Sequence, residues 1–216
     1  MPLFPRASTT PAARRRGRPR KTAQERDENP RRTELLRVAA HLFSTQGFAA
    51  TTTRAIAAAA GMQSGSPFYY FASKGALLHT VMQSGMTQAQ CSQAAALAAL
   101  PATAPARDRL RALIRSHFEV LVGADSDFIP VMLLEWRSLT PAQQRSITQQ
   151  KDAYEAAWMP VLEQLQATGR LAAQPAVARL FIFGALNWAV QWFDAGGALS
   201  LDELTDQALR LFIGEA

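Results

Sequence analysis

The densest positive charge in the chain lies in the sequence RRRGRPRK at residues 14–21. Residues 1–32 contain ten of the 23 Lys and Arg residues and three of the 17 Asp and Glu residues, so this segment carries +7 and the remainder −1. Clustered basic side chains bind polyanions, because each phosphate that they neutralise releases counterions and adds to affinity. The charge distribution therefore predicts an N-terminal arm whose partner is DNA.

Within this arm, RGRPRK at residues 16–21 is similar to the core of an AT-hook, in which Arg-Gly-Arg-Pro lies extended in the minor groove of A·T-rich DNA. That groove is narrow and strongly negative, so we predict that Arg16 and Arg18 insert into it and that Arg20 adds a further DNA contact. A solvated basic tail without base preference is the alternative, and the sequence leaves both open. Five prolines among polar residues predict that residues 1–30 are flexible.

The residues that support catalysis or metal binding in other proteins form no recognisable set in this chain. His41, His79 and His117 are scattered, without the spacing of a catalytic triad or a metal site. Cys91 is the single cysteine, so it forms no intramolecular disulfide, and we expect an inert, packed thiol in a reducing compartment. We expect no catalytic residue, no metal and no cofactor. An enzyme remains the third interpretation, after the two regulatory and architectural ones given below.

From residue 33 onward the apolar residues recur at helical spacing, as Leu36, Ala39, Ala40 and Phe43 do, and no segment alternates like a strand. Glycines and prolines divide this part into about nine helices, which predicts an all-α fold. The most apolar segment, residues 177–193, is interrupted by polar side chains and is shorter than the ~20 apolar residues of a membrane span. No apolar run follows the N-terminal arginines, so we expect a cytoplasmic protein without a secretory signal.

The first three predicted helices form a compact unit. A helix over 31–46 buries Leu36, Ala39, Leu42 and Phe43 and ends at a glycine. A second lies within 51–62 and is capped by a Thr hydroxyl, and a third begins near Pro67, with Ser64 as its cap. Two short helices joined at a glycine indicate a helix-turn-helix, whose second helix can enter a DNA major groove.

Residues 35–78 resemble the N-terminal DNA-binding domain of the TetR (tetracycline-repressor) family of bacterial regulators. The resemblance rests on Ala-Ala-x-Leu-Phe and Gly-Phe in the first helix, Thr-x-x-x-Ile-Ala-x-x-Ala-Gly in the second, an aromatic cluster in the third, and Ser-Lys-x-x-Leu opening the fourth. Three positions depart from the family pattern: Phe68 replaces a Tyr, Tyr70 replaces a His, and Pro67 replaces an aliphatic residue. The loss of the hydroxyl at position 68 removes one expected phosphate contact, which Tyr69 or Tyr70 can supply.

We predict that polar side chains on and before the third helix reach base edges and phosphates, while Phe68 and Phe71 fill the core. The resemblance implies further contacts to the DNA backbone from the start of the second helix and from Lys74, for which a solvated lysine is the alternative. The predicted DNA-binding set beyond the arm is Thr53, Arg54, Gln63, Ser64, Ser66, Tyr69, Tyr70 and Lys74. An ordinary three-helix packing unit is the plainer interpretation of this region.

The resemblance implies that residues 31–82 bind DNA and that residues 83–216 bind a ligand and form a homodimer. Residues 176–194 are apolar nearly all round, and residues 200–215 begin with a capping box, Ser200 and Glu203, before Leu201, Leu204, Ala208 and Leu211. These two helices and their symmetry mates are expected to form a four-helix interface, which would place two recognition helices on a palindromic operator. The core of a monomeric bundle is the alternative.

Polar groups within apolar helices suggest a ligand pocket, and the predicted lining is Phe118, Met132, Trp136, Arg137, Tyr154, Trp158, Asn187 and Gln191. Ordinary core aromatics and an Asn–Gln pair in the dimer interface are the alternative. EWRSL together with GALNWAVQWFDAGGALSLDEL is similar to TetR-family regulators that respond to acyl-coenzyme A thioesters. The sequence thus predicts a repressor released from its operator by a small molecule, with an architectural protein of A·T-rich DNA as the competing interpretation.

Overall fold

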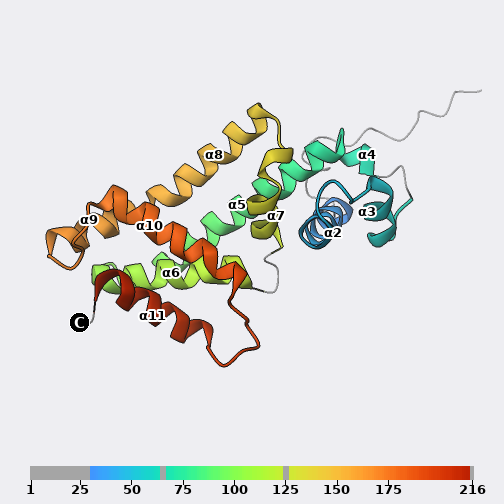
Figure 1. Cartoon of the computed structure of the whole chain (residues 1–216). Coiled ribbons are helices and arrows are strands. Elements are labelled where there is room, and N and C mark those ends of the chain that lie inside the picture. Colours follow the sequence, from blue (N-terminus) through green and yellow to red (C-terminus); the bar gives the residue numbers. More distant parts are fainter. Residues whose placement is uncertain (1–29, 64–66, 124–126, 215–216) are drawn as a thin grey trace, which may run out of the picture.

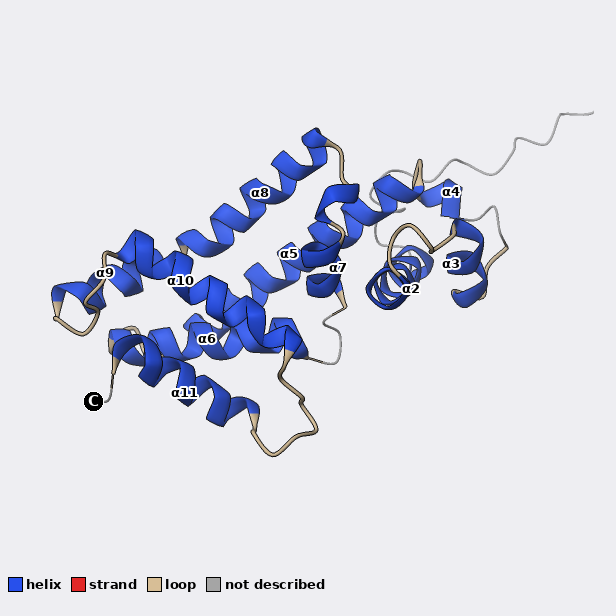
Figure 2. Cartoon of the chain, in the orientation of Figure 1, coloured by secondary structure: helices blue, strands red, loops and turns tan. Residues whose placement is uncertain are grey.

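The structure is a computed structural model that describes residues 30–63, 67–123 and 127–214. Within these ranges the chain forms ten α-helices and two short 3-10 helices and contains no β-strand, as Figure 2 shows. The prediction of an all-α fold is confirmed. The predicted DNA contacts Arg16, Arg18, Arg20, Ser64 and Ser66 lie outside the described residues.

The α-helices are α2 (Pro30–Gln46), α3 (Thr53–Ala59), α4 (Pro67–Tyr70), α5 (Lys74–Ala98), α6 (Ala106–Val122), α7 (Phe128–Leu134), α8 (Pro141–Ala156), α9 (Met159–Ala167), α10 (Pro175–Trp188) and α11 (Leu201–Ile213). The 3-10 helices span Trp136–Ser138 and Ala189–Gln191. The helix predicted over residues 176–194 therefore ends at Trp188, where its last turn tightens into the second 3-10 helix.

Helices α2, α3 and α4 gather at one end of the molecule, and the C-terminus lies near the other (Figure 1). The long helix α5 leads from α4 into the body, where it packs against α6 and α8, while α11 lies along α6. The short helix α7 contacts α2 as well as α5. α7 therefore belongs to the body in sequence and touches the DNA-binding end in space.

Helix ends follow local capping chemistry. The Thr52 side chain accepts a hydrogen bond from the Ala55 N–H at the start of α3, and Ser73 does the same for Ala76 at the start of α5. The capping box predicted at Ser200 and Glu203 is present at the start of α11. Such caps satisfy backbone donors that have no partner inside the helix.

Two expectations about the DNA-binding end were wrong. Phe71 is buried, but Phe68 is 56 % exposed, because α4 ends at Tyr70 and Phe71 lies beyond it, so that the two rings do not share a helical face. In α2 the fully buried positions include Leu35 and Val38, whereas Leu36 and Leu42 are only partly buried. The apolar stripe of α2 is therefore rotated relative to the one that the sequence suggested.

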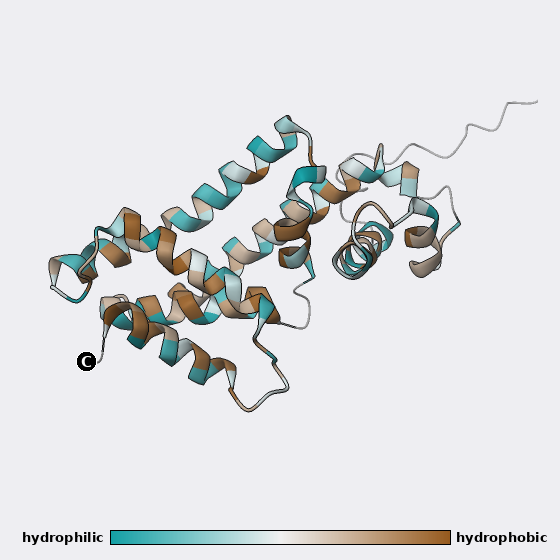
Figure 3. Cartoon of the chain, viewed as in Figure 1, coloured by the Kyte–Doolittle hydropathy of each residue, from teal (hydrophilic) through white to brown (hydrophobic). Residues whose placement is uncertain are grey.

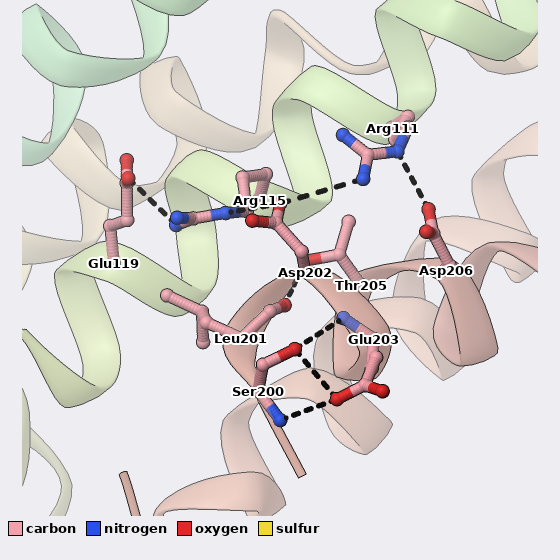
Figure 4. Close-up of polar contacts among 9 residues, drawn as sticks. All are labelled: Arg111, Arg115, Glu119, Ser200, Leu201, Asp202, Glu203, Thr205 and Asp206. Carbon is pink, nitrogen blue, oxygen red and sulfur yellow. Dashed lines mark hydrogen bonds and ion pairs between the residues drawn. The ribbon is translucent and has the colours of Figure 1, made fainter.

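Charged side chains hold α11 against α6 (Figure 4). The Arg111 Nε atom lies 2.6 Å from Asp206 Oδ1, and the Arg115 Nε atom lies 3.0 Å from Asp202 Oδ1. Hydrogen bonding from the Arg111 guanidinium lowers the pKa of the Asp206 carboxyl. Because exposed ion pairs contribute only ~0–1 kcal/mol each, the buried apolar face of α11 supplies most of the stability and these pairs fix its position.

Candidate DNA-binding, coupling and ligand sites

The outer face of α4 is aromatic and open to solvent. Tyr69 is 59 % exposed, close to the value for Phe68, and its ring meets that of the half-buried Tyr70 edge-on with centroids 5.0 Å apart. Arg54 and Gln63 are also exposed at this end of the molecule, and Thr53 is partly exposed. The described members of the predicted DNA-binding set other than Lys74 are thus carried by α3, α4 and the turn after α3.

Lys74 is engaged with the backbone of its own chain. Its Nζ atom donates to the carbonyl oxygens of Phe48 at 2.7 Å and Thr51 at 2.8 Å, and it lies 4.3 Å from the centroid of the Phe48 ring. These contacts tie the first residue of α5 to the turn that precedes α3. Sequence reasoning missed this internal role, and the predicted phosphate contact stays a prediction.

The two ends of α7 are hydrogen-bonded to the DNA-binding end. At the first, Asp127 accepts a hydrogen bond from the Ser44 hydroxyl at 2.7 Å and lies 3.2 Å from the His41 Nδ1 atom of α2. At the other, Glu135 Oε1 accepts from the Phe48 N–H at 2.8 Å. We call these contacts the α7 clamp, and they join the body of the molecule to the helix-turn-helix.

The packing around α7 is close on one side and open on another. Gly85 of α5 faces the Phe128 ring so closely that a Cβ atom at this position would overlap the ring. Nearby, a cavity of about 620 Å³ opens between α2, α5 and the start of α7, with Leu36, Ala40 and Phe128 in its wall. The cavity leaves space into which α7 can shift relative to α2.

The centre of the C-terminal bundle contains a closed polar cluster. The buried His117 ring pairs through Nδ1 with the Tyr154 hydroxyl at 2.9 Å and through Nε2 with Asn187 Oδ1 at 3.2 Å. Phe183 and Trp158 pack edge-on and near to this ring, at centroid distances of 5.2 Å and 6.1 Å. Burial lowers the pKa of His117 to about 4, so the imidazole is neutral at physiological pH.

A second polar chain extends this cluster. The Trp158 indole N–H donates to Gln93 Oε1 at 2.8 Å, and the Gln93 amide donates to the Tyr154 carbonyl at 3.2 Å. The buried Glu155 of α8 pairs with Lys151 at 3.0 Å and with Arg179 of α10, the residue that interrupts the apolar segment. Buried polar groups are stable when they are paired in this way, so the bundle is closed by its own hydrogen bonds.

The structure divides the predicted ligand residues into two groups. Tyr154, Trp158 and Asn187 meet around His117, which the sequence had given no role, and Phe118 is buried on the same helix as His117. Met132, Trp136 and Arg137 lie instead on α7 and the turn after it, and Gln191 is exposed beyond α10. Their arrangement along α7 could not be found from spacing alone, because residues 83–134 fold back on themselves.

An exposed apolar face covers parts of α10 and α11. Phe181 is 74 % exposed, Trp188 65 % and Leu211 77 %, and Leu180 is also open to solvent. Figure 3 shows more hydrophobic colour on α10 and α11 than on α8. Monomeric proteins rarely leave such patches uncovered. Cys91, by contrast, was expected to be packed, and the structure places it on the exposed side of α5.

Comparison with known proteins decides the family. Residues 103–215 match the family profile described as the tetracyclin repressor-like C-terminal domain, and residues 35–81 match that of bacterial regulatory proteins of the tetR family. The chain belongs to the TetR family. It is therefore a DNA-binding transcriptional regulator, with the family's helix-turn-helix in α2–α4 and its C-terminal helical domain in the rest of the described body. In the described residues of this TetR-family chain no helix is long and apolar enough to cross a membrane.

Relatives and solved structures support the same assignment. The TetR-family chain is 28 % identical over 186 residues to the HTH-type transcriptional repressor KstR2 of Rhodococcus jostii, covering 85 % of this chain and 89 % of KstR2. The crystal structure of the superantigen PfiT has 36 % identity and a TM-score of 0.74, covering 87 % of this chain and 98 % of PfiT. AibR in complex with isovaleryl coenzyme A and operator DNA has a TM-score of 0.77 at 23 % identity, covering 86 % and 100 % of the two chains.

Proposed function

We propose that this protein is a dimeric repressor that leaves its operator when an acyl-coenzyme A thioester binds in the C-terminal bundle. The observation that carries the proposal is the α7 clamp, because it gives the bundle a direct hydrogen-bonded connection to the DNA-binding end. The similarity of the EWRSL and 184–204 segments to acyl-coenzyme A-responsive regulators supports the choice of ligand. AibR, whose fold this chain shares, was crystallised with both kinds of partner.

The proposed division of labour follows the sequence boundaries. Residues 31–82 would bind the operator, residues 83–216 would bind the ligand and dimerise, and the basic arm over residues 1–30 would strengthen DNA binding. In the first of these regions the exposed side chains of α3 and α4 support the assignment. We infer also that the ligand leaves the protein chemically unchanged, which chromatography of the ligand released from the protein tests directly.

The exposed face of α10 and α11 is the proposed dimer interface. Gly184 lies in this face, between Phe181 and Trp188, and a Cβ atom there would meet nothing within 4 Å in the protomer. A glycine inside a helix costs ~0.5–1 kcal/mol relative to alanine, so a closely crossing helix from a second copy explains its presence. Gly184→Arg should therefore give monomers in sedimentation velocity, whereas Ala153→Arg on the exposed side of α8 should leave dimers.

The proposed response is a shift between two arrangements of the dimer. A ligand that replaces hydrogen bonds of the His117 cluster would favour a displaced α7, and α7 would pull on α2 through Ser44 and on the turn at Phe48. The cavity beside α2 provides the space for this displacement. Ligand binding changes DNA affinity only to the extent that the ligand binds the two arrangements with different affinity.

Footprinting on the DNA upstream of the protein's own gene tests the proposal, with and without acyl-coenzyme A thioesters of different chain length. A symmetric protected site that disappears with one thioester is the expected result. Protection that persists with every thioester would contradict the ligand assignment. Diffuse protection of A·T-rich tracts that is lost on deletion of residues 1–30 would favour the architectural alternative, since the repressor needs the arm only for part of its affinity.

A further inference from the structure

The Phe68 ring is exposed although it adds little to the fold. Its neighbours Pro67 and Phe71 are buried against the DNA-binding end, whereas Phe68 points outward beside Tyr69 on the open face of α4. An apolar ring in water forgoes the favourable free energy of burial that it would gain in a core or an interface. The ring is thus available to a partner that offers an apolar group.

The chemistry of the ring restricts what that group can be. A phenyl ring has no hydrogen-bond donor or acceptor of the kind that a phosphate or a base edge requires. In the major groove, guanine, cytosine and adenine present donors and acceptors, while thymine adds a C5-methyl group that apolar side chains contact. Of the groups on the floor of the groove, the thymine methyl is therefore the one that matches Phe68.

We propose that Phe68 contacts the C5-methyl group of a thymine in each operator half-site and thereby selects thymine at one position of the half-site. The inference rests on the proposed function, because it takes α4 as the helix that enters the major groove. Tyr69, with similar exposure, carries a hydroxyl and so can hydrogen-bond to a phosphate or a base. The two adjacent aromatic residues would then divide the work, one reading a methyl group and the other making polar contacts.

The test begins with operators enriched from a random duplex library by the full chain. Deoxyuridine then replaces thymine at each symmetric pair of positions, which removes one methyl per half-site and keeps base pairing intact. Burial of a methylene-sized group gives about 0.8 kcal/mol, or roughly fourfold in affinity, so the loss at one pair of positions should be about 15-fold. Replacement at the other thymine positions should have little effect.

Variants of the protein complete the experiment. Phe68→Ala should bind more weakly and should no longer distinguish thymine from deoxyuridine at the sensitive positions. Tyr69→Ala, the matched control on the same exposed face, should also bind more weakly but should keep that distinction. Because both side chains are exposed, equal melting temperatures show that neither change acts through folding.

Two results would overturn the inference. One is an operator in which no deoxyuridine substitution lowers affinity, and the other is a Phe68→Ala variant that still distinguishes the two bases. Failure of the proposed function looks different, because the library would then yield no enriched symmetric site for the wild-type chain.

Discussion

The two functional ends of this molecule treat their aromatic and polar side chains in opposite ways. On α4, Phe68 and Tyr69 are exposed, and their surface is complete before any partner binds. In the C-terminal bundle, His117, Tyr154 and Asn187 are joined to one another, so their hydrogen-bonding capacity is already used. A DNA surface of this kind binds without rearrangement, whereas a ligand can reach the polar groups of the bundle only by displacing the bonds between them.

Substitution of His117 should break this comparison most clearly. His117→Leu leaves the buried Tyr154 hydroxyl and Asn187 amide without their partner, so the free energy of unfolding should fall by about 2–4 kcal/mol. Arg54→Ala, at the exposed start of α3, should change stability by less than ~0.5 kcal/mol while weakening operator binding. Urea unfolding of both variants decides the matter, and equal stability losses would contradict the contrast between the two ends.

The same cluster should make stability depend on pH. Burial lowers the pKa of His117 from 6.5 to about 4, so between these values the unfolded chain binds a proton that the folded chain does not. Stability should therefore be complete above pH 6.5 and decrease as the pH falls toward 4, by up to ~3 kcal/mol.

His117→Gln is the matched control for this pH dependence, because glutamine can hydrogen-bond but does not titrate. Its stability should vary less with pH than that of the wild type over this interval, measured by urea unfolding at each pH. His79, whose pKa burial also lowers, contributes in the same direction in both proteins. An identical pH dependence in wild type and variant would assign the effect to groups other than His117.

Lys74 sharpens the comparison, because it belongs to the DNA-binding end but is bonded like a residue of the bundle. Lys74→Met removes two charge-assisted hydrogen bonds to backbone carbonyls and should cost about 1.5–3 kcal/mol of stability. If the role is internal, the slope of log affinity against log salt should stay as in the wild type. A phosphate contact would instead reduce the slope by ~0.9, so the salt titration separates the two roles.

Glu135 should give the smallest change in stability and an informative change in response. Glu135→Gln keeps an oxygen acceptor for the Phe48 N–H but removes the charge, and should cost roughly 1 kcal/mol or less. Glu135→Ala removes the bond altogether and should reduce the effect of the ligand on operator affinity. Fluorescence titrations of labelled operator with and without ligand measure this coupling, and full coupling in the alanine variant would show that this end of the α7 clamp does not transmit the response.

The sequence predicted the helical class, the helix-turn-helix and the caps because these depend on local spacing, as at Ser200 and Glu203. It failed at Phe68, because a four-residue helix has too little periodicity to define a buried face. It also gave no role to His117, whose partners Tyr154 and Asn187 lie 37 and 70 residues away in the chain. Long-range pairing of this kind has no signature in spacing, and the α7 clamp, which spans more than 80 residues, was missed for the same reason.

The fit of Phe128 against Gly85 has a genetic consequence. Since even one added carbon at position 85 would overlap the ring, Gly85→Ala must push the start of α7 aside without any small molecule. We expect cells carrying this substitution to express the controlled genes whether or not the natural signal is present. A single codon change inside the fold would thus imitate the metabolic state that the regulator senses.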